Sequence, residues 1–307
     1  MKKEVNYHNI SQQLKEKEFS HIIKWNEPLM NYTSLRIGGP ADIFCFPNHI
    51  EELLTVISIC QANQIPYYII GNGTNLLVLD QGIRGMVIKL GEGFKKIDLH
   101  QEKIHAGAGV SIQYLSTLAA KEGLSGLEFA INIPGTVGGC ILNNSSFNGN
   151  CMADIIESVT FLNKEKRIER KLLSELCFKY RECNLKNQGV IILDATLLLK
   201  KGDKDSIHTL MGKFIKIRKD RQPVNQLSAG SIFKNPEGYF AGELIEKVGL
   251  KGLARGKAMV SDKHANFIIN TGGAKATDIL WLIEEIQKKV EEKFNLKLEK
   301  EIEVLGE

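Results

Sequence analysis

Residues 41–70, ADIFCFPNHIEELLTVISICQANQIPYYII, place an apolar strand, a helix and a second apolar strand in succession. The strand ADIFCF opens the stretch, and after the helix-start residue Asn48 the apolar residues of 51–60 recur at helical spacing. Pro66 then precedes a buried strand over 67–70. The order strand, helix, strand predicts one α/β unit.

The same mixture continues on both sides of this unit. We expect further strands at LLVLD, MVIKL and KIHAGAG, near residues 155–162 and 190–199, around 266–270, and in the alternating edge segment LKLEKEIEVLG. We expect helices at residues 1–24, 111–122, 172–178, 206–220, 241–248 and 277–294. The pattern predicts an α+β protein of two or three lobes, without repeats.

The composition excludes several classes of protein. The chain has 307 residues, 43% hydrophobic side chains and a net charge of +4, which is too small to indicate nucleic-acid binding. Its six cysteines form no CxxC pair, and no histidine pattern completes a metal site. The polar N-terminus and the lack of long apolar stretches predict neither a signal peptide nor a membrane span. We therefore expect a cytoplasmic protein with reduced thiols and no metal, nucleic-acid or membrane partner.

Glycine clusters indicate where an anionic ligand could bind. Residues 107–112, GAGVSI, imitate a dinucleotide fingerprint but lack its third glycine and its acidic residue, which favours a structural turn. Residues 71–75, GNGTN, fit either an anion-binding nest of backbone N–H groups or a hairpin turn. Residues 133–139, IPGTVGG, lack the Gly-Lys-Ser/Thr ending of a nucleotide-triphosphate loop. Two such loops predict an extended ligand with a pyrophosphate.

Six segments together resemble a known family. They are residues 36–42 (RIGGPAD), 71–75, 133–139, 180–181 (YR), 230–236 (GSIFKNP) and 258–270. In this order the sequence resembles the UDP-N-acetylenolpyruvoylglucosamine reductase family, from about residue 31 to residue 306.

The resemblance implies a fold and a reaction. It implies an FAD-binding domain of the vanillyl-alcohol-oxidase-like (PCMH) type over residues 1–200, with lobes at about 25–90 and 91–200. It implies a C-terminal α+β substrate domain over 201–307, whose last strand, about 296–307, returns to the first lobe. NADPH would supply the hydride, and UDP-N-acetylglucosamine enolpyruvate would accept it in peptidoglycan (cell-wall) precursor synthesis. Because no insertion fits between Val190 and Arg218, we expect the subclass without the extra substrate loop. We also expect a monomer.

The resemblance also assigns site residues. For FAD they are Arg36, Gly71, Asn72, Gly73, Thr74, Asn75, Leu76, Ile133, Pro134, Gly135, Thr136, Gly138, Gly139 and Asn143. For the substrate they are Tyr180, Arg221, Asn235 and His264, although lone histidines are more often structural.

Three residues match the family's catalytic positions. Arg181 would pair its bidentate guanidinium with the substrate carboxylate, although its local sequence alone fits a surface arginine. Ser231 would donate the proton to the α carbon, and its local pattern also fits a cap or turn serine. Glu301 is chosen by the Leu-Glu-x-Glu spacing from three glutamates, at 299, 301 and 303, that would share one strand face.

Two departures from the family pattern lie near these positions. The family commonly reads Asn-Ala-Gly-Ala-Tyr-Gly-Gly where residues 143–149 read NNSSFNG. Asn148 can adopt a positive φ, whereas Ser145 replaces a glycine, so either its backbone is ordinary or the loop has shifted. Cys183 replaces the serine of a Tyr-Arg-x-Ser pattern with a weaker donor. These departures keep open a non-catalytic flavin or nucleotide-sugar binder, and a related flavin oxidase is a further alternative.

Overall fold

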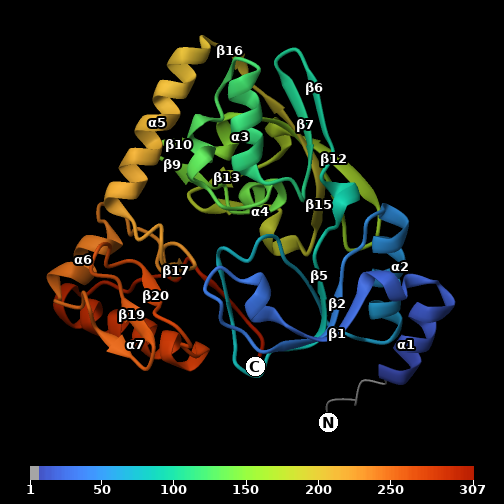
Figure 1. The fold of residues 1–307 in the computed structure, drawn as a ribbon, viewed down its shortest axis with the longest axis horizontal. Coiled ribbons are helices and arrows are strands. Elements are labelled where there is room, and N and C mark those ends of the chain that lie inside the picture. Colours follow the sequence, from blue (N-terminus) through green and yellow to red (C-terminus); the bar gives the residue numbers. More distant parts are fainter. Residues whose placement is uncertain (1–6) are drawn as a thin grey trace. The chain divides into compact units, whose positions relative to one another are not determined.

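The computed structural model describes residues 7–307, and its contacts divide the chain into two compact units (Figure 1). Unit 1 contains the residues up to Trp25, Ile43–Gly71 and Gly85–Ile215. Unit 2 contains Asn26–Asp42, Asn72–Arg84 and Lys216–Glu307. Two segments that precede residue 200 therefore belong to the same unit as the C-terminal residues.

The stretch quoted first folds as predicted. Strand β2 (Pro40–Cys45) is followed by α2 (Ile50–Ala62) and β3 (Tyr67–Ile69). Helix α2 buries Leu53, Val56, Ile57 and Cys60, which recur at helical spacing. Strand β3 pairs in parallel with β5 (Ile83–Ile88), and a parallel pair needs such a helical crossover.

A second sheet of unit 1 is antiparallel. Its order is β12-β11-β15-β7-β6, and Figure 1 shows several of these strands side by side. The strands are β6 (Ile97–His100), β7 (Lys103–Gly107), β11 (Ile156–Leu162), β12 (Ile168–Leu172) and β15 (Ile191–Leu198). Helix α3 (Ile112–Lys121) begins after Ser111, whose hydroxyl accepts from the Tyr114 N–H, and α4 (Val137–Leu142) follows the 133–136 loop.

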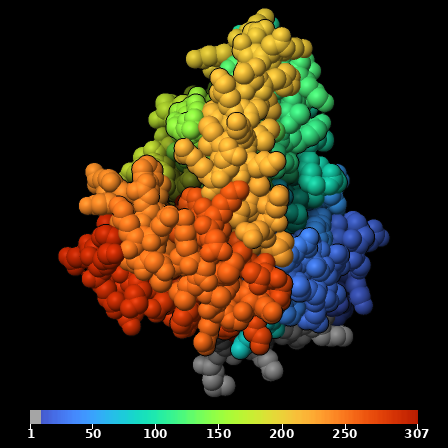
Figure 2. Space-filling model, turned by 60° about the vertical axis from the view of Figure 1, so that its left-hand side comes forward, coloured from blue at the N-terminus to red at the C-terminus, as the bar shows by residue number. Residues whose placement is uncertain are grey.

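Short elements connect these parts. They are α1 (Tyr7–Glu16), η1 (Phe19–Ile22), β1 (Ile23–Pro28), η3 (Glu92–Phe94), β8 (Leu124–Ser125), η4 (Glu128–Asn132), β9 (Ser146–Phe147), β10 (Asn150–Cys151), η5 (Met152–Asp154), η6 (Leu173–Glu175), β13 (Phe178–Lys179), β14 (Glu182–Cys183), η7 (Lys186–Gln188) and β16 (Lys200–Lys201). Helix α5 (Lys204–Arg221) exposes most of its side chains and forms the yellow-to-orange ridge in Figure 2.

Unit 2 is built around a small antiparallel sheet and two helices. The sheet order is β17-β20-β19-β18, with β17 (Leu227–Ser228), β18 (Ala254–Arg255), β19 (Ala258–Val260) and β20 (Ile268–Asn270). Helices α6 (Ala241–Lys247) and α7 (Ala276–Phe294) share its core, and α7 buries Ile279, Leu282, Ile283, Ile286 and Val290 along one face. Leu35, Ile37 and Leu77 belong to the same core, which explains why their segments join this unit.

The last strand pairs inside unit 2. Strand β21 (Glu303–Leu305) runs parallel to β4 (Leu76–Val78), with Glu303 opposite Leu76. The 3-10 helix η2 (Leu29–Tyr32) completes this unit. No helix in residues 7–307 is long and apolar enough to cross a membrane.

Some predicted elements are wrong. The helix expected over residues 1–24 ends at Glu16, and β1 already begins at Ile23; residues 1–6 lie outside the described part. The edge strand expected over 296–306 is a strand only at 303–305, because the preceding residues make a single bridge, at Lys300. The helical piece expected at 172–178 is one 3-10 turn over 173–175.

Candidate active site

The backbone beside Ser231 is held by the buried Asn266 of unit 2. The Asn266 carbonyl accepts from the Ile232 N–H at 2.9 Å. The Asn266 side chain accepts from the Phe233 N–H through Oδ1 at 2.9 Å and donates through Nδ2 to the Phe233 carbonyl at 2.8 Å. Asn266 is 3% exposed and Phe233 1%, so these bonds are shielded from water and fix the segment that carries Ser231.

Glu301 lies on the segment that adjoins this one. The Glu301 N–H donates to the Ile232 carbonyl at 2.8 Å, and Phe233 and Lys300 form an antiparallel bridge. Ile232 is the neighbour of Ser231 in the chain. Unit 2 therefore brings two of the predicted catalytic residues, Ser231 and Glu301, together on adjoining backbone segments.

The glutamates at the C-terminus have different surroundings. Glu299 is exposed and pairs with Lys234 at 3.3 Å, which agrees with a solvated edge position. Glu301 is half-buried, and Glu303 begins β21. The predicted shared strand face is wrong, because these residues do not lie on one continuous strand.

The loop at residues 72–75 adjoins Glu301. The Asn75 side chain donates through Nδ2 to the Glu301 carbonyl at 3.0 Å, and the Glu303 N–H donates to the Asn75 carbonyl at 3.0 Å. Gly73 has a φ of 63°, and a Cβ there would lie 1.9 Å from the Tyr32 carbonyl oxygen. Only glycine fits this turn. The Asn75 hydrogen bonds attach the predicted cofactor loop to the segment that carries Glu301.

The 133–139 loop lies in unit 1 and is supported by the 107–112 turn. The Gly138 N–H donates to the Ala108 carbonyl at 3.0 Å, and the Ile112 N–H donates to the Gly135 carbonyl at 3.1 Å. The Thr136 hydroxyl accepts from the Gly139 N–H at 3.4 Å and caps α4. The 107–112 segment therefore supports the 133–139 loop through backbone hydrogen bonds.

Gly71 ends the unit 1 part of this region, next to a cation that the sequence analysis did not identify. A Cβ on Gly71 would lie 2.7 Å from the Thr136 hydroxyl, so the two glycine loops touch here. The Lys89 ammonium donates to the Gly71 carbonyl at 2.5 Å. Burial, with a smaller effect of Lys95, lowers the pKa of Lys89. In the sequence, Lys89 is a polar residue within the predicted strand MVIKL, and nothing in that pattern indicates a binding role.

Asn132 immediately precedes the 133–139 loop and was not predicted as a site residue. Its side chain is 7% exposed, and among residues 7–307 its Nδ2 has no hydrogen-bond partner. A buried amide without a partner is rare and requires an explanation, such as a bound group that accepts its hydrogen bond.

Arg181 lies in unit 1, at the turn of the β13–β14 hairpin, with a φ of 59°. Its Nη1 donates to the Ser146 hydroxyl at 2.8 Å, and its guanidinium carbon lies 5.4 Å from the centre of the Tyr180 ring. Tyr180 is 50% exposed. A left-handed backbone on a non-glycine residue is a mild strain that is commonly found at functional sites.

The departures at 143–149 are accommodated without a strained serine. The non-glycine residues with positive φ in this loop are Asn144, at 38°, and Asn148, at 51°, whereas Ser145 has an ordinary φ. The first of the two alternatives for Ser145 therefore holds. Cys183 is buried, burial raises the pKa of its thiol, and Sγ lies 3.6 Å from Asn184 Oδ1.

The remaining cofactor-binding predictions have local contacts. Arg36 is exposed with a φ of 55°, and its Nη1 donates to the Asn31 carbonyl at 3.4 Å. The Asn143 side chain donates to the Gly139 carbonyl at 3.1 Å. Ile133, Pro134 and Gly135 lie in the loop that precedes α4, and Thr74 lies in the 71–75 loop. Leu76 is the first residue of β4.

Arg221 and Arg218 differ in their surroundings at the end of α5. The predicted substrate residue Arg221 is exposed. Arg218, which the sequence analysis did not select, is half-buried and donates through Nε to Gln222 at 3.1 Å. Burial lowers the pKa of Arg218, and among residues 7–307 no carboxylate pairs with it. Arg218 is therefore the better candidate for a phosphate contact.

Asn235 and His264 make contacts within unit 2. Asn235 Oδ1 accepts from the Ala241 N–H at 3.0 Å, at the first residue of α6. His264 Nδ1 accepts from the Asn266 N–H at 3.2 Å, which requires the neutral ring. Burial, with a smaller effect of Lys251, lowers the pKa of His264 in agreement with that state.

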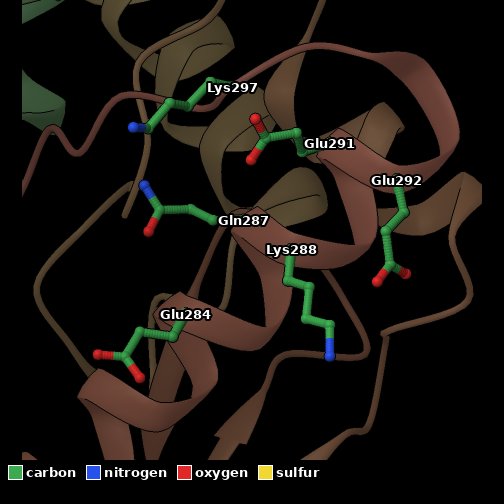
Figure 3. Close-up of a pocket in the computed structure, with 6 residues that line it drawn as sticks. All are labelled: Glu284, Gln287, Lys288, Glu291, Glu292 and Lys297. Carbon is green, nitrogen blue, oxygen red and sulfur yellow. The ribbon is translucent and has the colours of Figure 1, made fainter.

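A shallow depression on α7 lies outside this region. Its lining side chains are Glu284, Gln287, Lys288, Glu291, Glu292 and Lys297, and Figure 3 shows them around the end of the helix. All are charged or amide side chains, and none is a predicted site residue. Within the described part of the chain, no group of His, Cys, Asp and Glu residues is arranged to hold a metal ion.

Known families match both halves of the sequence. Residues 41–170 match a family described as an FAD binding domain. Residues 222–305 match the family of the UDP-N-acetylenolpyruvoylglucosamine reductase C-terminal domain.

Individual relatives match nearly the whole chain. The UDP-N-acetylenolpyruvoylglucosamine reductase of Clostridium novyi is 46% identical over 93% of this chain and 92% of its own length. The protein of the same name from Bacillus subtilis is 41% identical over 97% of this chain and 98% of its own length. The crystal structure of the enzyme from Thermus caldophilus matches with a TM-score of 0.80 at 38% identity, covering 92% of this chain and 98% of that one. These matches confirm the predicted α+β fold with an FAD-binding domain and a reductase C-terminal domain.

Proposed function

The chain belongs to the UDP-N-acetylenolpyruvoylglucosamine reductase family, and from this premise we propose how its residues carry out the reaction. The protein is an FAD-dependent oxidoreductase that uses NADPH to reduce the enolpyruvyl ether of UDP-N-acetylglucosamine. The observation that supports the proposed mechanism best is the placement of Ser231 and Glu301 on adjoining segments, held by Asn266.

The residues of the two glycine loops fit FAD. These residues would hold FAD, which would supply the hydride-transfer chemistry between NADPH and the substrate double bond. The buried amide of Asn132 lacks a protein partner beside the 133–139 loop, and a flavin or its pyrophosphate offers acceptors for it. The half-buried Lys89 places a positive charge at Gly71, which suits a pyrophosphate. We propose that these two side chains join the predicted cofactor residues.

The catalytic roles follow from the charge that develops on the substrate. Addition of hydride to the terminal carbon of the vinyl ether would leave negative charge on the α carbon and on the carboxylate. Arg181 supplies a permanent cation with paired donors that suits this carboxylate. Glu301 supplies a hydrogen-bonding acid, and Ser231 gives its proton to the α carbon. The Asn266 bonds keep the Ser231 backbone from moving while this proton transfers.

Substrate recognition is assigned to polar residues. We propose that the substrate is contacted by Tyr180, which is next to Arg181 in the chain. We also propose substrate contacts for Asn235 and His264, which lie in unit 2 with Ser231. We assign the phosphate contact to Arg218 together with Arg221, because the half-buried Arg218 lacks a carboxylate partner.

The wider setting is proposed from the same reaction. The product is a cell-wall precursor, and we propose that the protein acts in the cytoplasm, as a monomer, in peptidoglycan synthesis. We also propose that residues up to about 200 mainly serve FAD and residues 201–307 mainly serve the substrate. The family matches at 41–170 and 222–305 support this division of roles.

One anaerobic assay tests the function against its alternatives. The FAD-loaded protein is mixed with NADPH, with and without UDP-N-acetylglucosamine enolpyruvate, and NADPH oxidation is followed by absorbance. Turnover that depends on this substrate supports the reductase. Normal FAD binding without substrate turnover would indicate a non-catalytic binder. Turnover that is absent in the anaerobic assay and begins only when oxygen is admitted would indicate a flavin oxidase.

The role of Ser231 is tested by separating the two halves of the cycle. Ser231→Ala should leave flavin reduction by NADPH intact and cripple flavin reoxidation by the substrate. Equal loss in both halves would contradict the proposed proton transfer.

A further inference from the structure

The loop of residues 144–148, where this chain departs from the family pattern, touches Arg181. Ser146 stands where the pattern has alanine, and its hydroxyl accepts from Arg181 Nη1 at 2.8 Å. Alanine cannot accept such a bond. Ser146 therefore gives this chain a contact to the guanidinium that the common pattern lacks.

Asn144 supports the same hairpin through its backbone. Its side chain donates through Nδ2 to the Lys179 carbonyl at 3.0 Å and accepts through Oδ1 from the Ala153 N–H at 3.1 Å. Asn144 is 7% exposed, so both bonds are shielded from water. Its φ of 38° is tolerated better by asparagine than by the alanine of the pattern. Asn144 thus ties the hairpin strand that precedes Arg181 to the rest of unit 1.

The positive charge of Arg181 also affects the thiol of Cys140, which precedes this loop in the chain. Burial raises the pKa of Cys140 to about 12, and Arg181 and a hydrogen bond from Ser145 oppose this rise. Ser145 therefore faces Cys140, whereas Ser146 faces Arg181. The two neighbouring serines have different partners, which provides a matched control.

We propose that Ser146 and Asn144 are positioning residues for Arg181 in the reaction of this protein. Asn144 fixes the hairpin, and Ser146 holds one terminal nitrogen of the guanidinium in place. A long arginine side chain has many rotamers, so a fixed acceptor reduces the reorganisation needed before the guanidinium meets the substrate carboxylate. The inference rests on the proposed function, because it assumes that Arg181 acts on that carboxylate.

The test compares single-turnover rates of the FAD-loaded protein. In Ser146→Ala, flavin reoxidation at saturating substrate should slow by about 10- to 100-fold, the range for loss of a hydrogen bond to a charged group. Flavin reduction by NADPH and FAD affinity should not change. Ser146→Thr keeps the hydroxyl and should restore most of the rate, and the control Ser145→Ala should react like the unmodified protein. A Ser146→Ala protein with an unchanged reoxidation rate overturns the proposal.

A double-mutant cycle separates this inference from the proposed function. Ser146→Ala made in an Arg181→Lys background should add little further loss, because the bond is already gone. Full additivity of the two losses refutes positioning through Arg181. If Arg181→Lys alone leaves reoxidation at its normal rate, the proposed role of Arg181 itself is wrong.

Asn144 is tested through the stability of the hairpin. Asn144→Ala should slow reoxidation and should also increase amide hydrogen exchange in residues 178–183, whereas Ser146→Ala should change only the rate. Unchanged exchange and rate in Asn144→Ala would remove Asn144 from the proposal.

Discussion

Replacing Asn266 with alanine should damage both the stability of unit 2 and proton delivery by Ser231. The Asn266 side chain satisfies the N–H and the carbonyl of Phe233 at 2.9 and 2.8 Å, and Phe233 is only 1% exposed. Without the amide, two buried backbone groups lose their partners, at about 1–3 kcal/mol each, so we expect a loss of about 2–6 kcal/mol in the free energy of unfolding. Such a loss is a large fraction of the total for a protein domain.

Guanidinium unfolding followed by circular dichroism would measure this loss. The midpoint should fall while the slope with denaturant stays the same, which shows a change in stability rather than in the unfolded state. In the folded, FAD-loaded fraction of Asn266→Ala, both half-reactions are compared with those of the unmodified protein. The rate of flavin reoxidation by substrate should fall by a larger factor than the rate of flavin reduction by NADPH. The reason is that the Ser231 segment has lost its fixed register.

Asn270→Ala is the matched control for Asn266→Ala. Asn270 is also buried in unit 2 and bonds the Leu35 carbonyl and the N–H groups of Gly272 and Ala274. It should lower stability without selectively slowing reoxidation. A stability loss below about 1 kcal/mol for Asn266→Ala would show that Phe233 finds other partners and would refute the reasoning.

Three further changes test the cofactor loops and the pH response. Asn132→Leu should raise the free energy of unfolding of the apo-protein by about 1 kcal/mol, because it removes an unsatisfied amide. The same change should weaken FAD binding in a fluorescence titration, and tighter binding would exclude the proposed contact. Lys89→Met should weaken FAD binding by about tenfold, because it removes the cation at Gly71. The loss of affinity should be larger at low than at high ionic strength. A loss that does not depend on salt would argue against that role. The lowered pKa of His264 means that its contribution to stability is complete above pH 6.5 and is lost as the pH falls towards its folded-state pKa. His264→Gln should therefore show a shallower acid-side decline in urea melts, and an unchanged decline would show that His264 is not responsible.

Several elements were predictable because their signal is local. The helical spacing of apolar residues in α2 and α7, the serine cap before α3 and the apolar strands of the large sheet all follow from interactions between neighbours in the chain. The segment order likewise identified the family, and with it the cofactor and the reaction. Two failures lie at the ends of the chain, where a polar amphipathic pattern was extended to residue 24 and an alternating pattern to residue 296. A third is the helical piece expected at 172–178, of which only a 3-10 turn over 173–175 is present.

The sequence by itself determined the fold class and the positions of the two glycine loops, and it predicted the catalytic residue types, because spacing and residue chemistry are properties of the chain. Only the tertiary structure decided which segments share a core and which side chains meet. Residues 72–84 join the C-terminal residues through β4 and β21, although more than two hundred residues separate these strands along the chain. The proposed roles of Asn266, Lys89 and Ser146 also depend on hydrogen bonds between segments that are apart in the chain. No local pattern records a hydrogen bond that forms only when separate segments fold against each other.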